Sequence, residues 1–190
     1  MKHSVGPIYT IGHSTLPLDA FATALQDAGV RVLADIRTVP GSRTNPQYNL
    51  DTLPAFLATA DIGYAHLAQL GGLRGRTDLP QGLSPNTAWR NTSFRNYADY
   101  ALTSVFRQGF AELEALAASG PVAIMCAEAV WWRCHRRIVA DYLLVAGVLV
   151  FDVMPPAPPK PHDLTPFAVP QAGGTIYYQA PPEDKGISDG

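Results

Sequence analysis

The sequence predicts a single-domain α/β fold of the three-layer α/β/α type, in which helices cover both faces of a mostly parallel sheet of about five strands. Three observations support this prediction. A chain of 190 residues that is 47% hydrophobic can bury one sizeable core. Short apolar segments rich in β-branched residues alternate with segments of helical periodicity, as in Rossmann-like and flavodoxin-like proteins. From Met154 onward, nine prolines in 37 residues favour an irregular tail. We therefore expect an α/β domain over residues 1–153 and an extended, proline-rich tail over 154–190.

The first half of the domain contains three predicted strands and two predicted helices. Residues 8–11 and 30–36 are β-branched and apolar, and both segments end in polar or turn-forming residues. Between them, residues 18–28 carry apolar side chains at helical spacing before Gly29, and Ser14 or Thr15 is the expected helix cap. Residues 50–60 form the second predicted helix, and residues 64–70 the third strand.

The second half begins with a long loop over residues 73–95, which we interpret as a lid. One long helix is predicted over residues 94–118, because its apolar positions repeat at helical spacing until Gly120 and Pro121 end it. A wholly apolar strand over 122–125, a helix over 133–146 and a last strand over 148–153 complete the domain.

Polar and glycine-rich motifs follow four of the five predicted strands. They are Gly12-His13-Ser14, Asp35-Ile36-Arg37, Gly71-Gly72 and Cys126-Ala127-Glu128. In open α/β sheets, ligands bind outside the carboxyl ends of the strands. The one-sided placement of these motifs therefore predicts one functional site at this edge of the sheet.

Five residues at this edge are candidates for catalysis: Asp35, Cys126, Glu128, Cys134 and His135. A cysteine after a strand and before a helix can act as a thiolate nucleophile, with a carboxylate or an imidazole moving protons. The alternative is that both cysteines are small buried apolar residues. The paired Cys-x2-4-Cys spacing of zinc sites is missing, and neighbouring Cys134 and His135 are expected to point to different helix faces. We therefore predict neither a metal nor another cofactor.

The basic residues indicate an anionic ligand. Eleven of the 14 are arginines, all between positions 31 and 137, and arginine suits bidentate recognition of phosphate or carboxylate. Two long loops also mix arginines with aromatic residues such as Trp89 and Phe94, which suits phosphate plus a stacked base. The candidate substrate-binding residues are His13, Ser14, Arg37, Arg43, Gly71, Gly72, Arg74, Arg95, Tyr97 and Arg136.

Composition also limits the cellular setting. The net charge of −2 does not indicate general affinity for nucleic acid or anionic membranes, and no apolar run is long enough to cross a bilayer. Two cysteines within nine residues are typical of a reduced compartment. We expect a cytoplasmic protein without membrane partners, while the sequence does not indicate an oligomeric state.

Several ordered motifs resemble the bacterial family of domain of unknown function 488 (DUF488). They are Ile11-Gly12-His13-Ser14, Asp35-Ile36-Arg37 with Pro40 and Ser42, Leu70-Gly71-Gly72, Phe94-Arg95-Asn96-Tyr97-Ala98, and Cys126-Ala127-Glu128 followed by Cys134-His135-Arg136. The resemblance covers about residues 8–153 and implies a compact α/β domain that gathers these motifs at one site. It implies no particular activity. The chain differs from the family pattern in its aromatic segment 129–133 and its proline-rich tail.

These observations lead to one functional hypothesis and two alternatives. The leading hypothesis is a small hydrolase or transferase that acts on an anionic, nucleotide-like or nucleic-acid-derived substrate. In it, Arg37, Arg43 and Arg136 hold the anion, while Asp35 and Glu128 handle protons. The first alternative is a non-catalytic module that binds nucleotides or nucleic acid, and the second is a thiol redox switch using Cys126 and Cys134.

Overall fold

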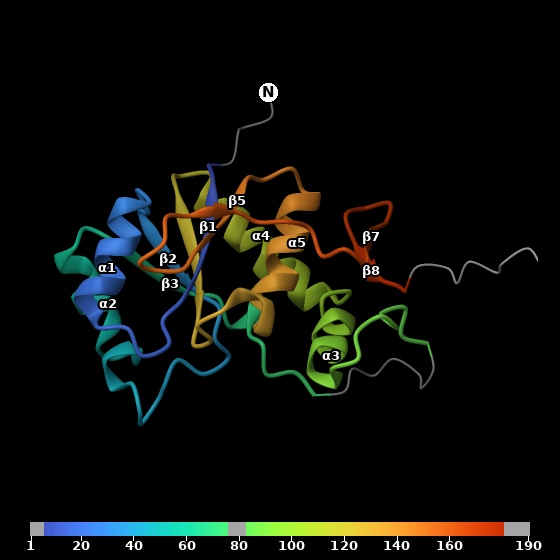
Figure 1. Ribbon diagram of the computed structural model, residues 1–190, viewed down its shortest axis with the longest axis horizontal. Coiled ribbons are helices and arrows are strands. Elements are labelled where there is room, and N and C mark those ends of the chain that lie inside the picture. The colour runs from blue at the N-terminus through green and yellow to red at the C-terminus, as the bar shows by residue number, and fades with distance from the viewer. Residues whose placement is uncertain (1–5, 76–82, 181–190) are drawn as a thin grey trace, which may run out of the picture.

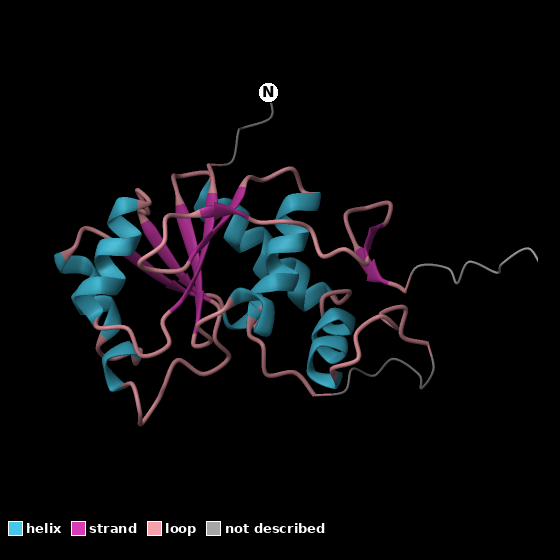
Figure 2. Ribbon diagram, in the orientation of Figure 1, coloured by secondary structure: helices cyan, strands magenta, loops and turns pink. Residues whose placement is uncertain are grey.

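The computed structural model describes residues 6–75 and 83–180. This part of the chain folds into a six-stranded sheet with helices on both faces, plus a small two-stranded sheet (Figures 1 and 2). The α-helices are α1 (Leu18–Asp27), α2 (Leu53–Thr59), α3 (Thr92–Tyr100), α4 (Ser104–Ala117) and α5 (Arg136–Val145). The strands of the main sheet are β1 (Ile8–Gly12), β2 (Val32–Asp35), β3 (Gly63–His66), β4 (Val122–Cys126), β5 (Val150–Val153) and β6 (Lys160–Pro161). Three 3-10 helices are η1 (Pro46–Tyr48), η2 (Ala68–Leu70) and η3 (Trp131–Arg133), and the second sheet pairs β7 (Ala168–Pro170) with β8 (Ile176–Tyr178).

The main sheet confirms the predicted α/β class. Its order is β3-β2-β4-β1-β5-β6, and every pair is parallel except β5 with β6, which is a short antiparallel pair at one edge. Strand β4 lies between β2 and β1, whereas the Rossmann order places the first two strands side by side. The carboxyl ends of β1, β2 and β4 consequently lie next to one another.

The alternation of side chains along the central strand divides the core into two layers. In β4, Val122 and Ile124 pack with the helices α3, α4 and α5, while Ala123 and Met125 pack with α1 and α2. Figure 1 shows α1 and α2 on one side of the strands and α4 and α5 on the other. A strand buried on both faces explains why the sequence of β4 is entirely apolar.

The structure corrects three predicted element boundaries. The single helix predicted over 94–118 is two helices, α3 and α4, because the Thr103 hydroxyl accepts a hydrogen bond from the backbone N–H of Phe106 and so caps a new helix. The strand predicted over 64–70 ends at His66, and its last apolar residues form η2. Helix α5 begins at Arg136, three residues later than predicted, so that Cys134 and His135 precede it.

The expected cap of the first helix is also wrong. The residue at the N-cap of α1 is Pro17, without a side-chain hydrogen bond. Ser14 instead has a positive φ of 43° and donates its backbone N–H to the carbonyl of Ala127. Its role is to turn the chain after β1.

The proline-rich segment packs against the rest of the fold through Ile176 and Tyr178. Ile176 and Tyr178 are fully buried, and the Tyr178 hydroxyl donates a hydrogen bond of 2.9 Å to the carboxylate of Asp141. His162 lies between two buried aspartates and its Nδ1 is 2.8 Å from Asp152 Oδ2. Buried polar contacts therefore anchor the proline-rich segment.

The loop interpreted as a lid divides into two parts. Residues 76–82 lie outside the described residues. Between them and α3, Asn86 and Trp89 are buried, and the Trp89 ring stacks on Phe94 at a centroid distance of 4.8 Å. This second part belongs to the core.

None of the helices in the described ranges combines the length and apolar character that crossing a bilayer requires.

Candidate functional site

A cavity of about 400 Å³ opens at the carboxyl ends of β2 and β4, where the sequence predicts the functional site. The surface of the cavity is mainly apolar. It is lined by Arg37, Thr38, Val39, Gly72, Leu73, Ser93, Phe94, Tyr97, Cys126, Ala127, Glu128, Arg133, Cys134 and His135. Residues from three of the four strand-end motifs therefore meet here, whereas Gly12, His13 and Ser14 are not part of this lining.

Asp35 and Arg37 form a buried ion pair beside the cavity. The Asp35 carboxylate accepts hydrogen bonds from the Arg37 guanidinium, from the Arg37 backbone N–H at 3.0 Å and from the Tyr64 hydroxyl at 2.8 Å. The guanidinium also donates to the backbone carbonyl of Tyr48. Asp35 is completely buried and is not part of the cavity lining. Its interactions position Arg37, which does line the cavity.

His13 supports the same arginine from behind. Its Nδ1 donates to the backbone carbonyl of Ser14, so in the neutral ring Nε2 accepts from an N–H of Arg37 at 3.3 Å. The ring stacks on Tyr48 with a centroid distance of 4.1 Å. Burial lowers the pKa of His13 despite the opposing effect of the bond to Ser14. His13 therefore remains neutral at pH 7 and serves as a positioning residue.

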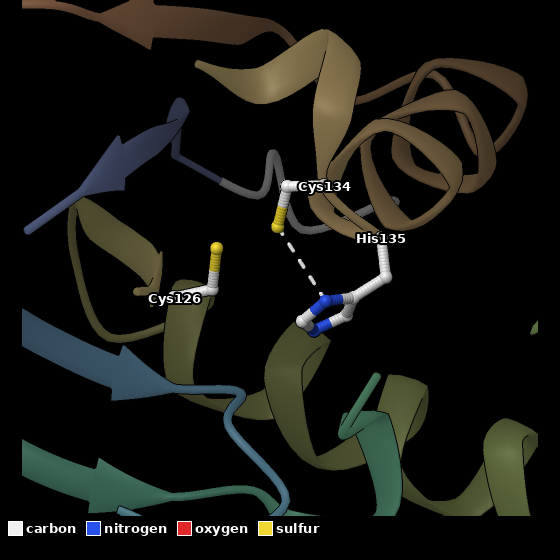
Figure 3. A group of neighbouring side chains, drawn as sticks. All are labelled: Cys126, Cys134 and His135. Atoms are coloured by element: carbon white, nitrogen blue, oxygen red, sulfur yellow. Dashed lines mark hydrogen bonds between the residues drawn. The ribbon is translucent and has the colours of Figure 1, made fainter. Parts of the chain in front are cut away.

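The centre of the site consists of Cys126, Cys134 and His135 (Figure 3). Cys126 ends β4, and the other two residues immediately precede α5. The two sulfurs and the nearest imidazole nitrogen all lie within 4.8 Å of one another. Cys134 Sγ is 3.5 Å from His135 Nδ1. Figure 3 shows both thiols and the imidazole ring pointing toward a common space.

Local backbone geometry brings these three groups together. Cys134 has an extended conformation, with φ of −127° and ψ of 151°, and only His135, the N-cap of α5, has helical angles. The expectation that Cys134 and His135 point to different faces of one helix is therefore wrong. Their ligand atoms converge with Cys126, and this group could hold a metal ion.

Hydrogen bonding determines the tautomer of His135. Its Nε2 lies 2.9 Å from the backbone carbonyl oxygen of Ile36 and must donate to it, since a carbonyl oxygen can only accept. In the neutral ring, Nδ1 therefore presents a lone pair toward Cys134. The imidazole is oriented to accept a proton from the thiol.

A buried arginine lies behind the sulfurs. Only 1% of Arg136 is exposed, and its guanidinium donates to the backbone carbonyl of Glu128 at 2.7 Å. Within the described residues, no carboxylate forms an ion pair with it. Burial opposes its charge, yet Cys126 and Cys134 together raise its pKa. A thiolate on one of these sulfurs would therefore be the counter-charge of this guanidinium.

The two cysteines share this charge unequally. Burial raises the pKa of Cys126 well above its ordinary value, and the neighbouring Cys134 raises it further. Burial also disfavours the thiolate of Cys134, but the neighbouring Cys126, the contact with His135 and the positive charge of Arg136 lower its pKa well below the ordinary value. The surroundings therefore favour a thiolate on Cys134 over one on Cys126.

Three glycines permit the close packing around this centre. A Cβ atom at Gly12 would collide with the Glu128 carbonyl, and one at Gly71 would lie 2.8 Å from the Cα atom of Thr38. A Cβ at Gly72 would overlap the imidazole of His135. Gly71 and Gly72 therefore shape the site by the absence of a side chain.

Several predicted site residues lie elsewhere. Arg43 is exposed and outside the cavity lining. Arg74 donates to the carbonyls of Ala68 and Gly71 and lies over the Tyr100 ring, so its guanidinium is occupied. Arg95 donates to the Trp89 carbonyl. These three arginines do not meet Arg37 and Arg136.

The position of Glu128 also differs from the expectation. Its side chain is exposed at the cavity, and none of the ion pairs in the described part of the chain includes it. The backbone carbonyl of Glu128, rather than its carboxylate, contacts Arg136. Tyr97 lines the cavity, but its hydroxyl donates to the Leu70 carbonyl and burial raises its pKa well above the ordinary value.

Sequence reasoning missed part of the lining. Arg133 and the apolar residues Val39 and Leu73, which are 66% and 77% exposed, also face the cavity. In the sequence, only the nearness of these three residues to Arg37, Gly72 and Cys134 indicates that they belong to the site. They add one cation and apolar surface at the mouth of the cavity.

Comparison with known proteins identifies the family of the chain. The family model described as "Domain of unknown function DUF488" matches residues 17–143, which is most of the α/β domain. The chain therefore belongs to the DUF488 family. The motif at residues 11–14 lies outside the matched range. No curated protein and no solved structure matches the chain.

Proposed function

We propose that this protein is a small enzyme, a hydrolase or transferase, in which the thiolate of Cys134 attacks an electrophilic substrate bound in the cavity. The observation that carries this proposal is the pairing of Cys134 with two cationic or basic groups. His135 Nδ1 lies 3.5 Å from the sulfur, and the buried Arg136 has no carboxylate partner among the described residues. Such an environment is typical of nucleophilic rather than structural cysteines.

The first chemical step uses atoms that line the cavity. With the Cys134 proton held on His135 Nδ1, the thiolate sulfur bonds to the electrophilic carbon or phosphorus of the substrate. The bond to the leaving group breaks, the leaving group keeps the electron pair, and His135 returns the proton to it. Water, or an acceptor in a transferase, then releases the group bound to sulfur.

His135 is assigned as the proton acceptor in place of Glu128. Its ring is oriented by the bond to the Ile36 carbonyl, whereas the Glu128 side chain is exposed. Cys126 acts as a positioning residue beside the thiolate, and its own thiol donates to the backbone carbonyl of Glu128. Asp35 acts through Arg37, because its carboxylate is buried in the ion pair.

The lining supports an anionic substrate with an apolar or planar body. Arg37 and Arg133 line the cavity, while Glu128 is the carboxylate there. Val39, Leu73 and Phe94 supply apolar surface, which suits a nucleotide-like molecule. The free thiols suit a reduced cytoplasmic setting.

The test is alkylation of the chelator-treated protein with limiting iodoacetamide, with each modified cysteine located by mass spectrometry. We expect Cys134 to react at least about tenfold faster than Cys126, and Arg136→Met to slow Cys134 by about tenfold or more. Preferential reaction of Cys126 contradicts the assignment. Substrate classes are then screened by intact mass for an adduct on the wild-type chain that Cys134→Ser does not form.

The proximity of the two sulfurs favours a second candidate, a thiol redox switch. A hydroperoxide would oxidise the Cys134 thiolate to a sulfenic acid and leave as the alcohol, and Cys126 would then displace water to form a disulfide. Intact mass after mild peroxide tests this step, because the disulfide lowers the mass by two hydrogens. An unchanged mass excludes the switch.

The alternative of a non-catalytic nucleic-acid module has less support, because Arg74, Arg95 and Trp89 are engaged within the fold.

A further inference from the structure

We propose that Cys126, Cys134 and His135 bind one Zn²⁺ ion through the two sulfurs and the imidazole Nδ1, with the fourth coordination position facing the cavity. This metal site goes beyond the proposed reaction and does not depend on it. It uses the same sulfur atoms, so metal binding would reversibly occupy the nucleophile.

The distances between the three groups are close to those of a tetrahedral zinc site. With Zn–S bonds of about 2.3 Å and Zn–N bonds of about 2.1 Å, the sulfurs lie about 3.8 Å apart and each lies about 3.5 Å from the nitrogen. Here, all three ligand atoms lie within 4.8 Å, and the Cys134 Sγ to His135 Nδ1 distance is 3.5 Å. Closing the group around a metal therefore requires side-chain movements of at most about 1 Å.

The surrounding hydrogen bonds prepare these groups as metal ligands. Histidine ligands usually donate their second ring N–H to a carbonyl or carboxylate, which fixes the tautomer and aims the lone pair. The 2.9 Å bond from His135 Nε2 to the Ile36 carbonyl does this and leaves Nδ1 directed at the sulfurs. The backbone N–H of Arg136 lies 3.4 Å from Cys134 Sγ, where it stabilises a metal-bound thiolate.

The donor set selects the metal. Two thiolates and an imidazole are soft and borderline ligands, and they favour Zn²⁺ over Mg²⁺ or Ca²⁺, which prefer oxygen. No carboxylate takes part in the group of ligands. Three protein ligands with an open position are typical of zinc sites that exchange a ligand.

Charge determines what occupies the fourth position. Two thiolates and a neutral imidazole balance the two positive charges of Zn²⁺, and the neighbouring Arg136 leaves a net positive charge in a buried environment. An anionic fourth ligand, such as hydroxide or the anionic group of a substrate, completes the balance. All three ligand residues line the cavity, so this ligand reaches the metal from the cavity side.

The experiment is a titration of the reduced, chelator-treated full chain with Co²⁺, a spectroscopic probe for zinc sites. We expect sulfur-to-cobalt charge-transfer absorption that saturates at about one Co²⁺ per chain and disappears when Zn²⁺ is added. Cys126→Ser, Cys134→Ser and His135→Gln should each weaken Co²⁺ binding at least about tenfold. His66→Gln is the matched control, because His66 lies near Arg37 but outside the ligand group, and it should bind as the wild type does.

Two results overturn the metal site: absence of the charge-transfer absorption in wild type, or equal absorption in Cys134→Ser. A second measurement needs no variant: Zn²⁺ should slow alkylation of wild-type Cys134 at least about tenfold, and an unchanged rate contradicts the proposal. The two proposals fail separately. If the protein binds the metal but Cys134 of the chelator-treated protein is alkylated slowly, the proposed nucleophile is contradicted and the metal site is not. If Cys134 is alkylated fast and Zn²⁺ does not change the rate, the metal site is contradicted and the nucleophile is not.

Discussion

Replacing Gly72 with alanine tests whether the position of the imidazole determines the chemistry of the site. The added Cβ would lie 2.7 Å from Cγ and 2.8 Å from Cε1 of His135, where ordinary contacts are 3.4–4 Å. The Cγ contact alone requires a ring movement of about 0.7 Å, the difference between 3.4 and 2.7 Å, and the added Cβ would overlap Nδ1, which lies closer still. The backbone of Gly72 is not in the left-handed region, so the substitution changes space and not conformational preference.

Such a displacement has two consequences. It disturbs the 2.9 Å bond to the Ile36 carbonyl and the 3.5 Å contact with Cys134 Sγ. Overpacking of this kind costs about 1–3 kcal/mol. In a chain of this length, each kcal/mol lowers the melting temperature by about 2–4 °C. We expect a melting temperature lowered by about 2–12 °C and slower alkylation of Cys134 in the folded variant.

The assay combines thermal unfolding with the iodoacetamide rate measured well below the melting temperature. Gly75→Ala is the matched control, because a Cβ at that position has no atom of the described residues within 4 Å. It should match the wild type in both measurements. If Gly72→Ala retains the wild-type melting temperature and alkylation rate, the close approach of Gly72 to the ring is refuted.

Three further substitutions test other parts of the structure. Tyr178→Phe removes a hydrogen-bond donor from the buried Asp141 carboxylate and should destabilise the fold by about 1–3 kcal/mol. The control Tyr177→Phe should have little effect, and equal denaturant midpoints of the two variants would contradict the tail contact. Thr103→Ala removes the cap of α4 and should lower the free energy of unfolding by about 0.5–2 kcal/mol. Replacing the exposed Ser104 with alanine should change it little, and a denaturant midpoint of Thr103→Ala no lower than that of Ser104→Ala would refute the cap. Gly71→Ala should destabilise the chain by about 1–3 kcal/mol, because its Cβ meets the Thr38 backbone, and wild-type urea unfolding would refute this.

The parts of the fold that follow from local sequence were predicted correctly. The apolar segment of β4 and the helical spacing of α1 predict their elements, because burial on one or both faces leaves a direct pattern in the sequence. The break between α3 and α4 was missed, since a single threonine side chain caps the second helix within an otherwise helical pattern. The end of β3 was missed because Leu67 and Leu70 are apolar in either conformation.

The candidate site was predictable where it depends on strand ends. Asp35 and Cys126 are placed by the register of β2 and β4, so their neighbourhood follows from a parallel sheet. The arginines outside the strands were not predictable in this way. Arg74 is held by carbonyls of η2 and by the Tyr100 ring, contacts that depend on how separate segments pack. The convergence of Cys134 and His135 likewise depends on one extended residue before α5.

The most direct test of the account is the ultraviolet thiolate absorbance of the native, chelator-treated protein at neutral pH, compared with Cys134→Ser and Cys126→Ser. We expect about one thiolate per chain in wild type, because the buried Arg136 requires one negative charge. This absorbance should be lost in Cys134→Ser and retained in Cys126→Ser. Wild-type absorbance no greater than that of Cys134→Ser would contradict the reactive thiolate at the centre of the site.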